Sequence, residues 1–108
     1  MADLKIRQIK IKTGIVRRLA KEEIYYKIES KQQVEKVERL KAEAGCEHVI
    51  WKQMEVLQES KMMIQDSHRR LAIAHEDLIN LLETEVDLDV SEEYKEALNV
   101  LDSVKLDG

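Results

Sequence analysis

The chain has 108 residues, 37% of them charged and 44% hydrophobic, with no proline, no phenylalanine and three glycines. Charged and aliphatic residues at helical spacing are typical of long helices or coiled coils, and so many apolar residues in register argue against disorder. No apolar run reaches the roughly 18 residues of a membrane span, and the N-terminus lacks the apolar core of a signal peptide. The single cysteine excludes an internal disulfide and fits a reducing compartment. These features predict one cytoplasmic helical domain over residues 1–108.

Charge is distributed unevenly along the chain. Residues 1–41 carry twelve basic and six acidic side chains, whereas residues 83–108 carry two basic and nine acidic ones. Such asymmetry indicates either a polyanionic partner or two termini that lie side by side and neutralise each other. The sequence leaves both interpretations open.

The first predicted element covers residues 3–43. Its beginning also fits an edge strand, because apolar residues alternate in part with Lys and Arg between Leu4 and Ile11. No second strand candidate exists to pair with it, and an isolated strand is not stable. A helix is therefore predicted, with Asp3 as its N-cap and with Gly14 costing about 1 kcal/mol inside it. The apolar stripe of this helix consists of Ile9, Val16, Leu19, Tyr26, Val34, Val37 and Leu40.

The second predicted helix covers residues 48–86. It follows a short break at residues 44–47, where Gly45 can form a left-handed C-terminal cap. A loop this short makes the two helices antiparallel neighbours. The apolar stripe follows a seven-residue ladder with alternating steps of four and three residues. Its members are Ile50, Met54, Leu57, Ile64, Leu71, Leu78 and Leu82, and the interrupting polar residues are Lys61, His68, His75 and Glu85.

The third predicted helix covers residues 91–106 and is less than half as long as the others. Asp89 or Ser91 is expected to cap it, and the acidic residues of its first turn suit the helix dipole. Its apolar stripe consists of Tyr94, Leu98, Leu101 and Val104. The predicted fold is all-α, an antiparallel, coiled-coil-like three-helix bundle with two long helices and one short C-terminal helix. The bundle should be three-stranded at the end that holds both termini and two-stranded near Cys46.

Polar residues are expected to face each other inside the long hairpin. If the chain turns near Cys46, Glu23 faces His68 and Ser30 faces Lys61. Such polar layers in a seam can fix the register of two helices at a cost in stability. The alternative is that both pairs lie at the hydrated edge of the seam, and the sequence does not decide between the two.

No catalytic, metal-binding or cofactor-binding constellation stands out. The sequence contains no Gly-rich phosphate loop, no His-Glu-x-x-His and no nucleophile beside an evident base. Cys46 and His48 lie two positions apart, but one cysteine and distant histidines favour a loop thiol over a metal site. Basic turns without aromatic residues between them give only weak support for nucleic acid. The sequence therefore predicts no enzyme, no cofactor, and no nucleic-acid or membrane partner.

A candidate partner-binding surface lies on the two long helices beyond the reach of the third. Apolar residues occur there outside the core stripes, with lysines that can meet an acidic partner. The candidates are Ile24, Tyr25, Ile28, Trp51, Val56, Met62, Lys27, Lys31 and Lys52. Trp51 comes one position after a core site, so it should be at least partly exposed. Scattered surface hydrophobic residues without a function are the alternative interpretation.

A rival surface is the basic start of the first helix. Its members are Lys5, Arg7, Lys10, Lys12, Arg17 and Arg18. Salt separates the two surfaces, because binding through exposed charges weakens steeply with ionic strength and binding through apolar contacts hardly changes.

Five stretches of the chain carry a family resemblance: RQIKIKTG (Arg7–Gly14), LQESKMMI (Leu57–Ile64), RRL (Arg69–Leu71), EEYKEA (Glu92–Ala97) and VLDSVKL (Val100–Leu106). Together they resemble the tubulin-binding cofactor A family. The resemblance covers essentially the whole chain and implies a three-helix protein without catalytic residues or a nucleotide. Where members of that family have a proline after Met-Met-Ile, this chain has Gln65, which removes the usual cause of a helix kink.

The resemblance also implies a function and partners. It implies a cytoplasmic chaperone, associated with the cytoskeleton, that captures and stabilises quasi-native β-tubulin before the α/β heterodimer assembles. The implied partners are β-tubulin and other tubulin-folding cofactors, and the implied state is a monomer or a weak homodimer. A generic coiled-coil adaptor or self-associating scaffold is the alternative, which co-purification with β-tubulin would separate from the chaperone.

Overall fold

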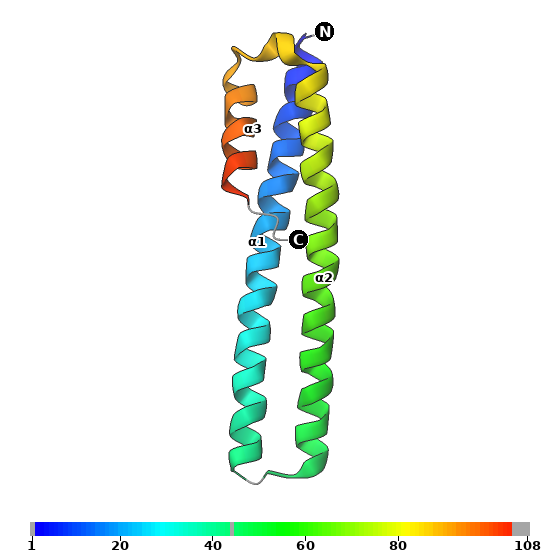
Figure 1. Ribbon diagram of the computed structural model, residues 1–108, viewed down its shortest axis with the longest axis vertical. Helices are drawn as coiled ribbons and strands as arrows, with labels where there is room; N and C mark the ends of the chain where they lie inside the picture. The colour runs from blue at the N-terminus through cyan, green and yellow to red at the C-terminus, as the bar shows by residue number, and fades with distance from the viewer. Residues whose placement is uncertain (1, 44, 105–108) are drawn as a thin grey trace. The chain divides into compact units, whose positions relative to one another are not determined.

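The computed structural model describes residues 2–43 and 45–104. Along the chain these residues form α1 (Ala2–Ala42), α2 (Glu47–Thr84), the short 3-10 helix η1 (Val86–Leu88) and α3 (Glu92–Ser103) (Figure 1). No strand occurs within the described ranges, so the all-α class is confirmed and the edge-strand alternative at the start of the chain is wrong. The chain divides into two compact units, Met1–Lys21 with His68–Gly108 (unit 1) and Glu22–Ser67 (unit 2).

The helix ends differ from the predicted ends in ways that the caps explain. α1 begins at Ala2, so Asp3 lies in the first turn, where it suits the dipole, and is not the N-cap. Gly45 is not left-handed; its N–H donates to the Leu40 carbonyl at 2.9 Å, and a Cβ there would lie 3.1 Å from the same oxygen. A side chain at position 45 would therefore fit only tightly against the backbone of α1.

The predicted second and third helices are both shorter in the structure. α2 ends at Thr84, and Val86, the last residue of the predicted helix, begins η1 instead. Ser91, not Asp89, caps α3 by accepting the N–H of Tyr94 at 3.2 Å. α3 ends at Ser103, and the predicted helical residues 105–106 lie outside the described ranges.

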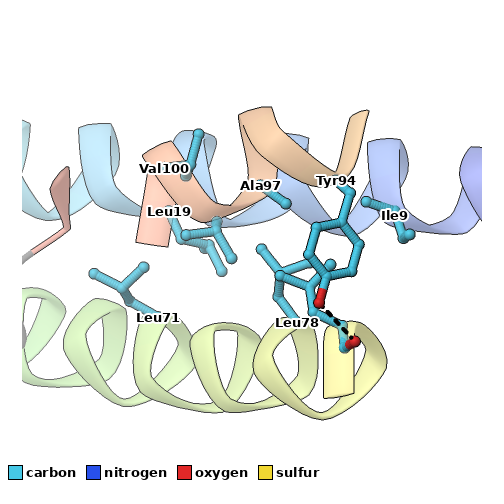
Figure 2. Close-up of a cluster of buried hydrophobic side chains, with 9 residues drawn as sticks. Ile9, Leu19, Leu71, Leu78, Tyr94, Ala97 and Val100 are labelled. Atoms are coloured by element: carbon cyan, nitrogen blue, oxygen red, sulfur yellow. Dashed lines mark hydrogen bonds between the residues drawn. The ribbon is translucent and has the colours of Figure 1, made fainter. Parts of the chain in front are cut away.

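Unit 1 is an antiparallel three-helix bundle. α3 lies beside the N-terminal part of α1 and the C-terminal part of α2 (Figure 1). The core contains Ile9, Val16, Leu19, Leu71, Leu78, Leu82, Tyr94, Ala97 and Val100. The Tyr94 ring reaches from α3 toward α2, where its hydroxyl group donates to the Leu82 carbonyl at 3.0 Å (Figure 2).

The predicted stripe of α3 needs one correction. Leu98 is 49% exposed, whereas Ala97 and Val100 are buried. The hydrogen bond of Tyr94 to α2 fixes the rotation of α3, so that the positions three and six residues after Tyr94 face inward and Leu98 points to the side.

Unit 2 is an antiparallel hairpin built from the C-terminal part of α1 and the N-terminal part of α2. The side-chain amide of Gln33 donates to the backbone carbonyl of Gln53 at 2.8 Å and to its side-chain oxygen at 2.9 Å. Because Gln53 faces α1, the next residue, Met54, is 45% exposed, which corrects its predicted place in the core stripe. Val37 is buried as predicted.

Polar side chains occupy several inward positions of unit 2. Glu23, Ser30 and Ser67 are buried, and Lys61 is exposed. The hydroxyl oxygen of Ser67 has no hydrogen-bond partner in the part of the chain that the structure describes. Burial of Glu23 and Ser30 argues against a hydrated edge at these two positions, and a role in fixing the register stays a prediction.

Candidate functional site

The apolar candidates of unit 2 lie at the surface. All six are exposed, with exposed fractions between 43% for Val56 and 62% for Tyr25. The predicted exposure of Trp51 is confirmed at 59%. Val49, Met54 and Met63 are exposed as well, so that unit 2 exposes nine large apolar side chains. Val37 is the only apolar side chain that is buried among the described residues of this unit.

This balance between exposed and buried side chains is reversed in unit 1. There, nine apolar side chains are buried and six large ones are exposed. The difference follows from the number of helices, because a two-helix hairpin has only one seam and cannot cover the remaining sides of its helices. Unit 2 therefore offers an apolar surface that a partner could cover.

The structure divides the six candidates between two outward faces of the hairpin. Ile28 is nine positions before the buried Val37, which is two and a half turns and places it on the opposite side of α1. Ile24 lies one turn before Ile28, and Tyr25 lies beside it, with its ring in edge contact with that of Tyr26. We call Ile24, Tyr25 and Ile28 the outer face of α1.

The second outward face belongs to α2. Met62 is nine positions after Gln53, whose side chain is bonded to α1, and therefore lies on the side of α2 away from α1. Trp51 lies three turns before Met62 on the same side. We call Trp51 and Met62 the outer face of α2. Val56 lies on the flank between this face and the seam, so that the candidates do not form a single patch.

A shallow hollow lies beside Trp51 in the first turns of α2. Its lining residues are Glu47, His48, Ile50, Trp51 and Met54. Methionine adapts its shape to a partner more easily than branched side chains do, and tryptophan is enriched at the energetic centres of interfaces. The hollow is thus suited to an apolar side chain of a protein partner.

The three candidate lysines differ in their surroundings. Lys27 forms an ion pair with the buried carboxylate of Glu23 at 3.0 Å, one helical turn away. Lys31 and Lys52 are exposed and have no ion-pair partner among the described residues. Lys31 and Lys52 are therefore the candidates that remain available to an acidic partner.

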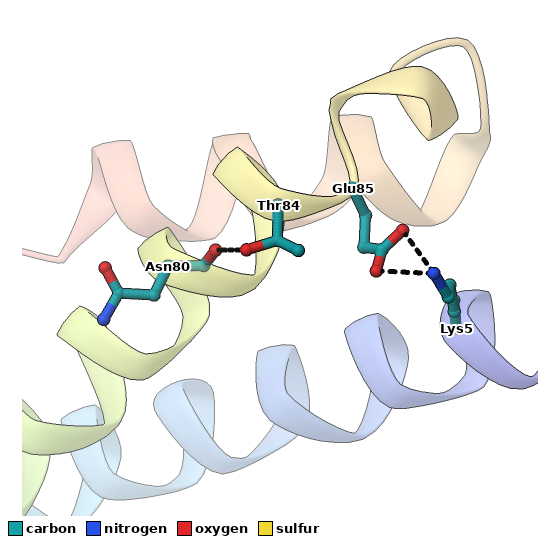
Figure 3. A network of polar contacts seen from close by, with 4 residues as sticks. All are labelled: Lys5, Asn80, Thr84 and Glu85. Atoms are coloured by element: carbon teal, nitrogen blue, oxygen red, sulfur yellow. Dashed lines mark hydrogen bonds and ion pairs between the residues drawn. The ribbon is translucent and has the colours of Figure 1, made fainter.

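At least half of the rival basic surface is occupied by ion pairs within unit 1. Lys5 pairs with Glu85 at 2.9 Å (Figure 3), and Lys12 pairs with Asp77. Arg17 of α1 pairs with Glu96 of α3. Neutralisation of the basic start of the chain by its acidic end, one of the two interpretations of the charge gradient, is confirmed for Lys5 and Arg17.

The pair of Lys5 and Glu85 joins the start of α1 to the end of α2. Glu85 is buried, and Lys5 is half exposed. The pKa of Lys5 is raised above its ordinary value near 10.5, first by the hydrogen bond to Glu85 and then by the negative charge of that carboxylate. A buried carboxylate without such a partner would be costly, so Lys5 has a structural role here.

No group of three or more His, Cys, Asp or Glu side chains in residues 2–43 and 45–104 is placed to hold a metal ion. A second hollow, in unit 1, is lined by side chains of α1 and α3, among which Arg17 and Glu96 form an ion pair: Lys10, Thr13, Arg17, Glu92, Glu93 and Glu96. Cys46 is exposed and free.

Comparison with known proteins identifies the family. A family model described as tubulin binding cofactor A matches residues 5–101. The chain belongs to the tubulin binding cofactor A family. Tubulin-specific chaperone A of Bos taurus is 62% identical over 108 residues, which is 100% of both chains.

Solved structures of this family have the same fold. The structure of the human tubulin chaperone cofactor A matches with a TM-score of 0.82 at 60% identity, and it covers 94% of this chain and 99% of its own. The crystal structure of tubulin folding cofactor A from Arabidopsis thaliana matches with a TM-score of 0.85 at 31% identity, covering 94% and 95%. No helix among the described residues of this cofactor A family chain is both long and apolar enough to cross a membrane.

Two features of this cofactor A family chain were not predicted from its sequence. Tyr94, within the EEYKEA motif, anchors α3 to α2 through its hydroxyl group. Gln33 and Gln53 bind each other across the hairpin of unit 2. The tyrosine could have been noticed as the one aromatic residue of the short helix, whereas two glutamines on separate helices give no sequence signal.

Proposed function

We propose that this protein is a tubulin-folding chaperone that captures and stabilises quasi-native β-tubulin before the α/β heterodimer assembles. Membership of the tubulin binding cofactor A family over residues 5–101 carries the proposal. The names of the relatives, tubulin-specific chaperone A among them, support tubulin as the client. This proposal includes β-tubulin as the specific client and transfer of the client to other tubulin-folding cofactors. It also places the protein in the cytoplasm, in association with the cytoskeleton.

The proposed mechanism is the covering of apolar client surface by unit 2. A folding intermediate exposes apolar surface through which it would otherwise aggregate. Unit 2 is the part of the chain best suited to cover such a surface, because nine of its large apolar side chains are exposed and only one apolar side chain among its described residues is buried. Charged residues beside the apolar faces, such as Lys31 and Lys52, would speed the encounter with an acidic client. This mechanism requires no catalytic group and no nucleotide, which is why we propose that the protein is not an enzyme.

Capture by variants of each outer face tests the proposal. Trp51→Ala with Met62→Ala truncates the outer face of α2, and Tyr25→Ala with Ile28→Ala truncates the outer face of α1. All four side chains are exposed, so the fold should persist, which circular dichroism would verify. We expect at least one double variant to capture freshly translated β-tubulin roughly tenfold more weakly, at low and at high salt alike.

A matched control truncates exposed apolar side chains elsewhere. Ile73→Ala with Val90→Ala removes side chains that are 66% and 79% exposed in unit 1 and should leave capture unchanged. Full capture by both outer-face variants would refute the proposed surface. Failure of the unaltered protein to bind β-tubulin, with self-association in sedimentation, would refute the chaperone and favour the coiled-coil scaffold.

A further inference from the structure

Gly14 lies within α1, where nothing in the described fold requires a glycine. A methyl group added at this position would meet no atom within 4 Å, in contrast to Gly45. Glycine is less favourable than alanine inside a helix, because it loses more backbone entropy on folding. Gly14 therefore lowers the stability of α1 without a packing gain inside the part of the chain that the structure describes.

Three cations of α1 without an ion-pair partner among the described residues lie on the same side of the helix as this glycine, and we call these four residues the Gly14 stripe. Lys5, Lys12 and Arg17 have partners within the unit, whereas Arg7, Lys10 and Lys21 form no ion pair with any described residue. Residues 7, 14 and 21 recur every seven positions and so share one side of the helix, and residue 10 lies within one turn of both 7 and 14. All four are exposed.

The stripe is suited to a partner of opposite charge. Residues 4–21 contain no acidic residue, so no carboxylate of α1 itself lies on this stripe, although Glu92, Glu93 and Glu96 of α3 line a hollow together with Lys10. Arg7 and Lys21 are separated by about 21 Å along the helix, which is the length of roughly four turns of a second helix. Two packed helices come closer together when the side chains at their contact are small, and a glycine offers the smallest contact.

We propose that this stripe docks an acidic α-helix of the tubulin client, which crosses α1 closely at Gly14 and directs carboxylates toward Arg7, Lys10 and Lys21. The inference rests on the proposed function and adds to it a second contact, made by unit 1, that is separate from the outer faces of unit 2. The absent side chain at position 14 then has a role, because it leaves room for the backbone of the partner helix.

Substitutions of Gly14 provide a test that separates folding from binding. Gly14→Ala should raise the unfolding temperature of the full chain by about 4 °C, because alanine favours the helix and meets no neighbour. The same substitution should weaken capture of β-tubulin, and Gly14→Leu should weaken it further, by roughly tenfold or more. Gln8→Leu places the same leucine side chain at another exposed position of α1 and should leave capture unchanged.

Removal of the unpaired charges tests the acidic character of the partner. Arg7→Gln with Lys21→Gln should weaken capture at low salt and reduce its salt dependence. Lys36→Gln with Lys41→Gln removes the same charge from exposed positions of α1 in unit 2 and should have little effect.

Each contrary result has a distinct meaning. Unchanged capture by both Gly14 variants, with normal capture by the unaltered protein, would overturn this inference and leave the proposed function standing. A Gly14→Ala protein that is no more stable would overturn the premise that the fold does not need the glycine. If the charge variant weakens capture but Gly14→Leu does not, an extended acidic segment binds and the docked helix is wrong. If the unaltered protein captures no β-tubulin, the proposed function and this inference both fail.

Discussion

Removal of a single hydroxyl group should measurably weaken the attachment of α3. The Tyr94 hydroxyl group donates to the Leu82 carbonyl at 3.0 Å in a buried position. Leu82 lies in the last turn of α2, where carbonyl groups lack the N–H partner that a longer helix would provide. Such a hydrogen bond contributes about 0.5–1.5 kcal/mol net to the free energy of unfolding. A buried acceptor that loses its donor lowers that free energy by about 1–3 kcal/mol. We therefore expect Tyr94→Phe to lower the free energy of unfolding by about 1–2 kcal/mol.

Urea and thermal unfolding would measure this effect. For a domain of this size the expected loss corresponds to a fall of roughly 4–8 °C in the unfolding temperature. Tyr25→Phe is the matched control, because the Tyr25 side chain is 62% exposed and its substitution should change stability by less than about 0.5 kcal/mol. Equal and small effects of the two substitutions would refute the role assigned to the Tyr94 hydroxyl group.

Three further predictions concern the fold. The ion pair of Lys5 with Glu85 should contribute fully to the free energy of unfolding below pH 10.5, and this contribution should be lost as the pH rises through the raised pKa of Lys5. Urea unfolding of Lys5→Gln should no longer show this alkaline loss, and its persistence would contradict the assignment. Leu78→Ala should cost about 2–5 kcal/mol and Val56→Ala less than about 0.5 kcal/mol, and similar losses would mean that the core stripe is misassigned. Single-domain behaviour stays a prediction: Trp51 fluorescence and far-ultraviolet circular dichroism should report one transition, and two separate transitions would contradict it.

The sequence predicted the fold class well, because a seven-residue apolar ladder without proline permits few structures besides packed helices. Its errors fall where the rotation of a helix depends on tertiary contacts. The spacing predicts Leu98 in the core, but the bond from Tyr94 to α2 turns Ala97 inward instead. The spacing likewise predicts Met54 in the seam, but Gln53 occupies that position through its pair with Gln33.

The candidate surface was predictable only in part. Exposure of Trp51 followed from its place one residue beyond the core stripe, and the structure agrees. The division of the candidates between two outer faces did not follow, because helical spacing within one helix says nothing about the sides that two helices turn toward each other. The sequence also could not show that Lys5 pairs with Glu85, eighty positions away, or that a Cβ at Gly14 would have no atom within 4 Å.

Site-specific photocrosslinking tests most directly whether unit 2 covers β-tubulin. A benzoylphenylalanine placed at position 51 or 25 replaces an exposed aromatic side chain on an outer face, and one placed at Ile73, which is 66% exposed in unit 1, serves as the control. Complexes captured from a folding reaction should give crosslinks to β-tubulin from position 51, position 25 or both, and none from position 73. Crosslinks from position 73 alone, or a stable complex without any crosslink from positions 25 and 51, would contradict the proposed function of unit 2.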